Sequence, residues 1–291
     1  MSQSLGGGTL VYQTTLVGGG DPPHGFELAL LRHNLAMQRT VRFARGSARS
    51  DEVNADYGVR SPCVRLYRAG GATLYAKALH RVRFCIELPP PPELGGREGE
   101  PELVPDGETV VAGVRCRRAL YRDSGRQLAI AYADDLTVDD PTGAVVQLAG
   151  VPGLVMAWEE LPRPGAHWWL SVAISELSRD PTGPLALPDG YTQFASVDQA
   201  RAEDRRMIEA EAPPSSDAFS GRWRWEGGDV ELDIAPSRLR TIAPSGTRDE
   251  AAARHGSLLV VEDTPNLRLY QLDDRGRLVL ADDDGFRFVR I

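Results

Sequence analysis

Short segments rich in β-branched and aromatic residues recur along the chain, and glycine, proline and aspartate separate them. Such segments form strands, and most of their connections are shorter than the crossover of about a dozen residues that a parallel pair requires. The pattern therefore predicts a mainly β protein built on antiparallel sheets. The strands expected first are 8–17, 37–44, 63–68, 73–77, 80–88, 109–121, 127–132, 154–158 and 167–174, with 26–35 as a strand or a short helix. The polar segment 45–60 and the segment 93–106, rich in proline, glycine and glutamate, are predicted to be loops.

The last third of the chain begins with one expected helix at residues 196–211. Ser196 and Gln199 have the spacing of a capping box, and the apolar stripe that follows is thin. Pro213 and Pro214 end the helix and open a linker. Further strands are expected at 221–225, 230–234, 239–242, 257–262, 267–272, 277–280 and 285–289, enough for a small barrel or a compact meander. The chain is thus predicted to have a β domain at 1–195, a helix and linker at 196–216, and a small all-β domain at 217–291.

Turn residues and an apolar run are joined in the stretch 148–158. Gly150 and the pair Pro152-Gly153 have turn chemistry, and Gly153 occupies the position of a type II turn that requires a positive φ. The run 154–158 is uninterrupted, as expected of a strand buried on both faces. A tight turn entering such a strand brings backbone to a place where little else would fit.

Two segments of the chain resemble landmarks of the GLPGLI family. Residues 150–155, Gly-Val-Pro-Gly-Leu-Val, resemble its Gly-Leu-Pro-Gly-Leu-Ile signature, and residues 110–119, which contain Cys116, are similar to its second landmark. The resemblance covers roughly residues 9–176, with valine in place of the family's residue at 114, 151 and 155. It implies an open, curved antiparallel sheet, a half-barrel like that of lipoprotein-carrier proteins. The family has no established activity, so the resemblance implies no catalytic residues.

Composition restricts the partners and the compartment. A formal net charge of −8 disfavours nucleic acid, whose phosphates require a basic face. No run of about 18 apolar residues is present, so no transmembrane segment is expected. The first twenty residues lack the features of a signal peptide, which predicts a cytoplasmic protein. The family resemblance would instead imply a periplasmic or secreted protein from which a signal had been removed.

The three cysteines are an odd number, so at least one has no partner within the chain. Cys85 and Cys116 lie on strands predicted to be neighbours, where they could meet. In a reducing compartment all three are expected to be reduced core residues.

Motifs of catalysis are missing from the sequence. The five histidines have no metal-ligand spacing, and neither a Cys-x-x-Cys nor a Gly-x-Ser-x-Gly pattern occurs. We therefore predict no catalytic residue, no metal and no cofactor.

The aromatic residues offer the candidate contacts. Trp168 and Trp169 should lie on opposite faces of one strand, and His167, Trp168, Trp169 and Trp158 are candidates for a ligand or partner groove. Trp223 and Trp225, two residues apart, should share one face, either in a core or in a binding patch.

Two hypotheses of function remain open at this point. In the first, the protein is a non-enzymatic binding protein whose curved sheet holds an apolar small molecule or a peptide segment of a partner. In the second, it is a structural or assembly subunit that forms homo-oligomers through sheet edges and aromatic patches.

Overall fold

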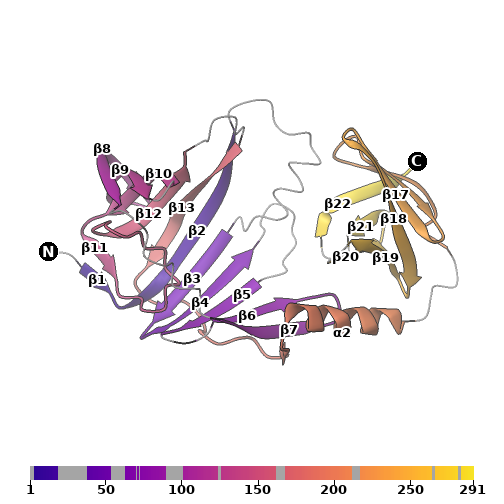
Figure 1. The fold of residues 1–291 in the computed structure, drawn as a ribbon, viewed down its shortest axis with the longest axis horizontal. Coiled ribbons are helices and arrows are strands. Elements are labelled where there is room, and N and C mark those ends of the chain that lie inside the picture. Colours follow the sequence, from indigo (N-terminus) through magenta and orange to yellow (C-terminus); the bar gives the residue numbers. More distant parts are fainter. Residues whose placement is uncertain are drawn as a thin grey trace.

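The computed structural model describes residues 3–18, 38–53, 63–69, 71, 73–89, 101–123, 126–161, 168–211, 217–263, 266–280 and 283–291. Figure 1 shows a large curved sheet, a barrel formed by the last quarter of the chain, and helix α2 running between them. The predicted mainly β architecture, with a curved open sheet, a connecting helix and a C-terminal β unit, is confirmed.

The large sheet has twelve strands in the order β14-β7-β6-β5-β4-β3-β2-β13-β12-β10-β9-β8. All neighbours are antiparallel except the two-residue strand β14, which is parallel to β7. The bounds are β2 (Gly7–Gly18), β3 (Gln38–Ala44), β4 (Ser47–Val53), β5 (Cys63–Arg68), β6 (Thr73–Ala78), β7 (Arg83–Leu88), β8 (Glu102–Val111), β9 (Val114–Asp123), β10 (Arg126–Ala133), β12 (Leu154–Glu160), β13 (Trp168–Ser178) and β14 (Thr192–Gln193). A separate short pair joins β1 (Gln3–Leu5) in parallel to β11 (Leu136–Val138).

Two predicted loops contain strands. Strand β4 lies inside the segment 45–60, and strand β8 begins at Glu102, inside 93–106. Both strands carry charged side chains, so their sequences lack the alternation of apolar and polar residues that predicts a strand. The charges of β4 are paired within the fold, and the charges of β8 lie at an exposed edge of the sheet.

The segment 109–121 is a hairpin and not the single strand that was predicted. The chain reverses between β8 and β9 at Ala112 and Gly113, whose φ values are 49° and 77°. Two successive positive φ values are the requirement of a tight two-residue hairpin turn. The strand predicted from residue 80 begins only at Arg83, and the segment 26–35 lies outside the described residues.

The C-terminal strands close into a barrel in which each strand pairs with the next and β22 returns to β15. The bounds are β15 (Gly221–Trp225), β16 (Glu231–Ala235), β17 (Arg238–Ala243), β18 (Gly246–His255), β19 (Leu258–Asp263), β20 (Asn266–Leu272), β21 (Leu278–Leu280) and β22 (Asp283–Arg290). The sequence did not indicate β18, whose residues Glu250 to Ala253 favour helices when isolated. Its two barrel neighbours give it hydrogen-bonding partners on both edges, which outweighs this preference.

The two tryptophans of β15 belong to the barrel core. Trp223 is 1% exposed and its Nε1 donates a hydrogen bond to the Phe219 carbonyl at 2.8 Å. Trp225 is also buried in the same apolar cluster. The core interpretation of this pair is therefore confirmed.

Helix α2 (Val197–Glu209) begins with the predicted cap. The Ser196 hydroxyl accepts a hydrogen bond from the Gln199 N–H at 3.1 Å, and the Gln199 side chain accepts one from the Ala195 N–H at 3.0 Å. The first bond satisfies a backbone donor that the helix itself leaves unpaired, and the second holds the residue that precedes the cap.

A single buried stripe lets this short helix contact both β units. Ala200, Asp204 and Ile208 are buried and lie four residues apart, on one side of the helix. Ala200 packs in a cluster with Phe84 of β7, whereas Ile208 packs with Leu258, Val260 and Leu269 of the barrel. The predicted linker at 213–216 lies outside the described residues, so the division into domains stays a prediction.

Cys85 and Cys116 do not lie on neighbouring strands, contrary to the prediction. Cys85 lies on β7 and Cys116 on β9, and nine inter-strand spacings separate these strands in the sheet. At about 4.8 Å each, this is roughly 40 Å along the sheet, far beyond the reach of a disulfide. All three cysteines are free thiols in the structure. Among the described residues, no helix has the length and apolar character needed to cross a bilayer.

Candidate binding face of the large sheet

Gly150 and Gly153 are both required, but for different reasons. Gly150 has the positive φ, 75°, that was predicted for Gly153. Gly153 itself has no positive φ, so the predicted type II turn position is wrong. A Cβ at Gly153 would lie only 2.0 Å from the backbone oxygen of Ala133. The close approach of backbone to backbone is what excludes a side chain here, and Pro152 beside it is exposed.

The strand that follows is buried as predicted over its first three residues, whereas Ala157 and Trp158 are only partly buried. Leu154, Val155 and Met156 of β12 are at most 3% exposed. Cys116 is buried in the same core, where burial raises the pKa of its thiol. The motif around Gly150 is therefore part of the core architecture of the sheet.

Trp158 and Trp169 lie on opposite faces of the sheet. Trp158 pairs with Val172 and Glu159 with Ser171, so Trp169 shares the face of Glu159. The Trp169 Nε1 accordingly donates a hydrogen bond to the Glu159 carboxylate at 2.6 Å. The structure does not bring these two candidates together, and His167 and the side chain of Trp168 lie outside the described residues.

Trp158 is half-buried and joins two apolar clusters. Its ring meets Tyr12 edge to face, with centroids 5.8 Å apart. We call the side of the sheet that carries Tyr12 and Trp158 the Trp158 face. This position gives Trp158 a packing role at one end of that face.

The opposite face of the central strands is closed by the chain itself. The segment 179–191 crosses it after β13, and Leu187 and Tyr191 pack against a cluster that includes Val64. The guanidinium of Arg49 donates to the Ala186 carbonyl and also holds Asp51, with Nε to Oδ1 at 3.1 Å. The Trp158 face is therefore the candidate side of the central strands for a ligand site.

Two elements cover the ends of the Trp158 face. At one end Ala144 and Val145, in the loop after β11, pack into the cluster of Tyr12. At the other end helix α2 packs through Ala200 on Phe84 and Ile86. Among the described residues, no contact places a third element over the strands between them.

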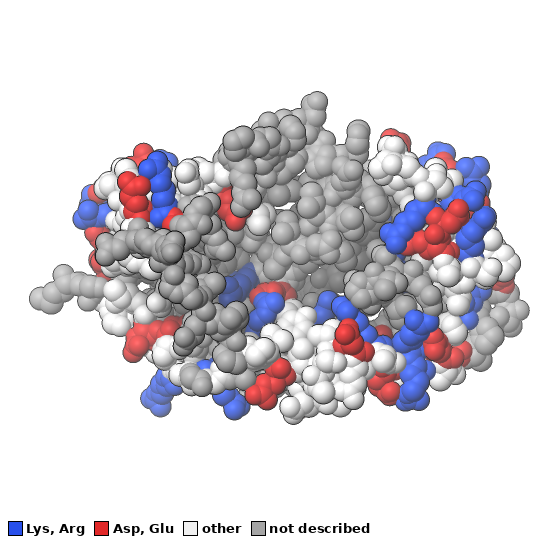
Figure 2. Space-filling view, in the orientation of Figure 1, with Lys and Arg blue, Asp and Glu red and all other residues white. Residues whose placement is uncertain are grey.

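The strands between the two covers carry a band of polar side chains. Cross-strand pairing places Tyr12 opposite Arg39, Arg39 opposite Glu52, and Glu52 opposite Cys63. Lys77 continues this row, because Val64 pairs with Ala76 and Lys77 pairs with Phe84. Arg65 and Tyr75 face each other in the adjacent row on the same side. We define the polar band as Arg39, Glu52, Cys63, Arg65, Tyr75 and Lys77. Figure 2 shows basic and acidic side chains beside one another on the described parts of this side of the molecule.

Glu52 is the electrostatic centre of the polar band. Its Oε1 forms ion pairs with the guanidinium of Arg65 and, at 3.9 Å, with Nε of Arg39. Arg39 is held further, since it donates to the Ser50 hydroxyl and to the Ala144 carbonyl, each at 2.9 Å. The side chains of Arg39, Glu52 and Arg65 are 25%, 17% and 32% exposed. These charges are thus half removed from water and fixed in position.

The thiol and the phenol of the polar band remain neutral at physiological pH. Burial raises the pKa of the Cys63 thiol, and this outweighs the opposite influence of Arg65. Burial also raises the pKa of Tyr75 to about 12. A nucleophilic cysteine requires a lowered pKa, so the band provides hydrogen-bonding groups and no activated nucleophile.

Alkylation of Cys63 should show this directly. In a variant that carries Cys85→Ala and Cys116→Ala, we expect the rate of reaction with iodoacetamide to rise with a midpoint pH above that of an ordinary cysteine. The reason is that burial disfavours the thiolate, which is the reacting form. The same variant unfolded in guanidinium chloride is the control. A native midpoint below the unfolded one would show an activated thiol and contradict this interpretation.

Sequence reasoning missed the polar band for an identifiable reason. Its members lie between residues 39 and 77 on four different strands, and β4 was not predicted at all. Their only sequence signal is that Lys77 is the single lysine of the chain.

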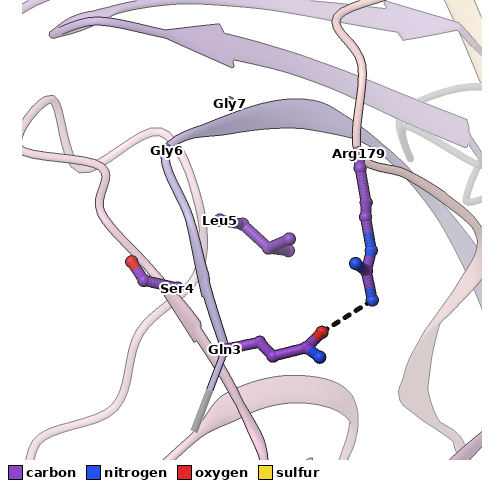
Figure 3. A pocket seen from close by; sticks show the side chains of 6 residues that line it. All are labelled: Gln3, Ser4, Leu5, Gly6, Gly7 and Arg179. Carbon is purple, nitrogen blue, oxygen red and sulfur yellow. Dashed lines mark hydrogen bonds between the residues drawn. The ribbon is translucent and has the colours of Figure 1, made fainter.

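A cavity of about 420 Å³ lies elsewhere, where β1 leads into β2 (Figure 3). It is lined by Gln3, Ser4, Leu5, Gly6, Gly7 and Arg179. Arg179, its one charged side chain, already donates a hydrogen bond to Gln3 at 2.7 Å. Among the described residues, no group of three or more histidine, cysteine or acidic side chains is placed to hold a metal ion.

Both edges of the large sheet are protected against strand addition. Strand β14 covers part of the edge of β7. The other edge, β8, contains Pro105 and an irregularity before Glu108, and exposed ion pairs such as Arg122 with Glu102 connect it to β9. Proline, bulges and charge are the usual means of preventing edge-to-edge pairing. The edges therefore give little support to assembly through strand pairing.

Comparisons with known proteins do not name a family. No family model matches the chain, so membership of the GLPGLI family stays a prediction, and no curated protein matches it either. Among solved structures, the chain is similar to PNGF-II with 11% identity and a TM-score of 0.36, covering 80% of this chain and 40% of that one. It is similar to MucB in complex with MucA(peri) with 12% identity and a TM-score of 0.29, covering 97% and 85%. The Pseudomonas aeruginosa MucA/MucB complex is similar with 13% identity and a TM-score of 0.21, covering 96% and 86%. Similarities at this level carry no conclusion about what this protein does.

Proposed function

We propose that this protein is a non-enzymatic binding protein that holds an extended segment of a partner protein on the polar band. The observation that carries the proposal is the placement of the band on the Trp158 face. It lies between the cover of Ala144 at one end and helix α2 at the other, while the opposite face is closed by the segment 179–191.

The chemistry of the band favours a peptide over a purely apolar molecule. An apolar ligand would remove the charges of Arg65 and Lys77 from water without replacing their hydrogen bonds, which is costly. An extended peptide brings a backbone carbonyl at every residue, and guanidinium, ammonium and phenol groups are donors to such oxygens.

The alternative of a homo-oligomeric assembly subunit has less support. It requires accessible sheet edges, and β14 on one side and Pro105 on the other restrict strand pairing at both. Light scattering after size exclusion separates the two hypotheses, since the binding protein is expected to be a monomer without its partner.

A defined set of short synthetic peptides, arrayed on a surface, tests the binding function. Wild-type protein is expected to bind a subset of them, and Arg65→Ser is expected to weaken that binding about fivefold or more by removing a half-buried donor from the band. The matched control is Arg122→Ser, which also removes a strand arginine paired with a glutamate, but at the exposed edge. The proposal fails if the wild type binds no peptide or if both variants bind as the wild type does.

A further inference from the structure

We infer that the polar band selects an acidic segment, with two carboxylate side chains four residues apart in an extended peptide. This inference rests on the proposed function and adds the chemical class and spacing of the partner segment to it.

The charges of the polar band do not balance. Arg39, Arg65 and Lys77 are three cations, and Glu52 is the one carboxylate among the six members. Glu52 is shared by both arginines, and no ion pair between Lys77 and a carboxylate is found among the described residues. The band therefore carries an excess of positive charge on a chain whose formal net charge is −8.

Because these cationic side chains are half-buried, their excess positive charge attracts an anion more strongly than exposed charges would. A charge that is partly removed from water interacts more strongly with an opposite charge than a fully exposed one does. The guanidinium of Arg39 is also fixed by Ser50 and Ala144, so its orientation is set before a ligand arrives. Preorganised and incompletely neutralised cations favour an incoming anion.

The register of the strands sets the distance between the two outermost cations of the polar band. Arg39 on β3 and Lys77 on β6 lie in one row across the sheet, three inter-strand spacings apart. At about 4.8 Å each, these spacings amount to roughly 14 Å. An extended peptide advances about 3.3 Å per residue, so acidic side chains four residues apart, which lie on the same side of the peptide, match this distance.

Three fluorescent peptides test the inference by anisotropy on the full chain. The first has the sequence Glu-Val-Thr-Val-Glu, the second replaces both glutamates with glutamine, and the third, Glu-Glu-Val-Thr-Val, keeps the composition but changes the spacing. We expect the first to bind about fivefold or more tightly than either comparator, with an advantage that shrinks as salt rises. Lys77→Met should remove most of this advantage, and Lys77→Arg should keep it.

The outcomes separate the inference from the proposed function. If all three peptides bind equally, the acidic selectivity is overturned and the binding function stands. If none binds, both are overturned. If sodium dodecanoate displaces the first peptide and binds more tightly than it, the carboxylate partner is a lipid-like molecule and the peptide assignment is wrong.

The single lysine provides a second measurement that needs no variant. Lys77 is the only lysine of the chain, so acetylation by an amine-reactive reagent, located by peptide mapping, reports on one side chain. The first peptide should slow acetylation of Lys77 at least about threefold, and the glutamine peptide should not. Equal protection by both peptides would overturn the acidic selectivity, and this readout holds even if the Lys77 variants fold poorly.

Discussion

Replacing Gly153 with alanine is expected to lower the free energy of unfolding of the large sheet by about 3 kcal/mol or more, or to prevent its folding. A Cβ at this position would lie 2.0 Å from the oxygen and 2.7 Å from the carbon of the Ala133 carbonyl, and 2.9 Å from the Asp134 Cα. All three atoms belong to backbone and cannot rotate away. The ladder between Ala133 and Leu154 would have to separate, at the point where β12 enters the core.

Urea denaturation followed by far-ultraviolet circular dichroism measures this loss. Gly143→Ala is the matched control, because Gly143 has a positive φ of 72° but nothing within 4 Å of a Cβ. Backbone strain alone should cost about 1 kcal/mol there. Equal losses in the two variants would show that backbone conformation, and not the close approach, explains Gly153.

Replacing Asp204 with alanine is expected to release helix α2 from the sheet, with a loss of about 3 kcal/mol from its docking. The carboxylate of Asp204 is buried and accepts hydrogen bonds from the backbone N–H of Arg81 at 2.6 Å and of Val82 at 2.9 Å. Its removal leaves both donors without this partner, one of them in the buried turn that leads into β7. Hydrogen exchange of these two amides should then accelerate by about two orders of magnitude.

Two further variants test whether the loss of docking comes from the missing Asp204 carboxylate or from general destabilisation of the helix. Asp204→Asn keeps an oxygen that accepts a hydrogen bond, so it should retain part of the docking energy. Asp198→Ala removes an acidic residue of the same helix whose side chain is 89% exposed, and should leave the amides protected. Slow exchange in Asp204→Ala would contradict the role assigned to this carboxylate.

Limited proteolysis of Asp204→Ala also tests the proposed division of the chain. If residues 217–291 fold as a separate unit, cleavage near residues 213–217 should release an intact C-terminal fragment, and faster in this variant than in the wild type. Glu211, just after the helix, also accepts a hydrogen bond from Arg81 at 2.5 Å, and this hydrogen bond lowers the pKa of its carboxyl group. A fragment that is degraded at once would argue that the barrel depends on the sheet.

Much of the architecture was accessible from local sequence pattern. The capping pair Ser196 and Gln199, the buried run after Gly153 and the shared face of Trp223 and Trp225 were all predicted, and the structure confirms them. Each depends on residues within a few positions of one another. Strand and helix periodicity and turn chemistry act over the same short range, which is why the sequence alone determined the β class, the helix and the C-terminal β unit.

The candidate site was decided by tertiary structure. Arg39, Glu52 and Lys77 form one row only because four strands pair in a particular register, and register is set by contacts between distant segments. The charged strand β4 resembled a loop because the partners of its charges lie on other strands and on the segment 179–191. Gly153 is likewise explained by Ala133, twenty residues before it, and not by its own turn. Strand pairing across the sheet thus determined which side chains lie next to one another on each face. No local sequence pattern contains that information.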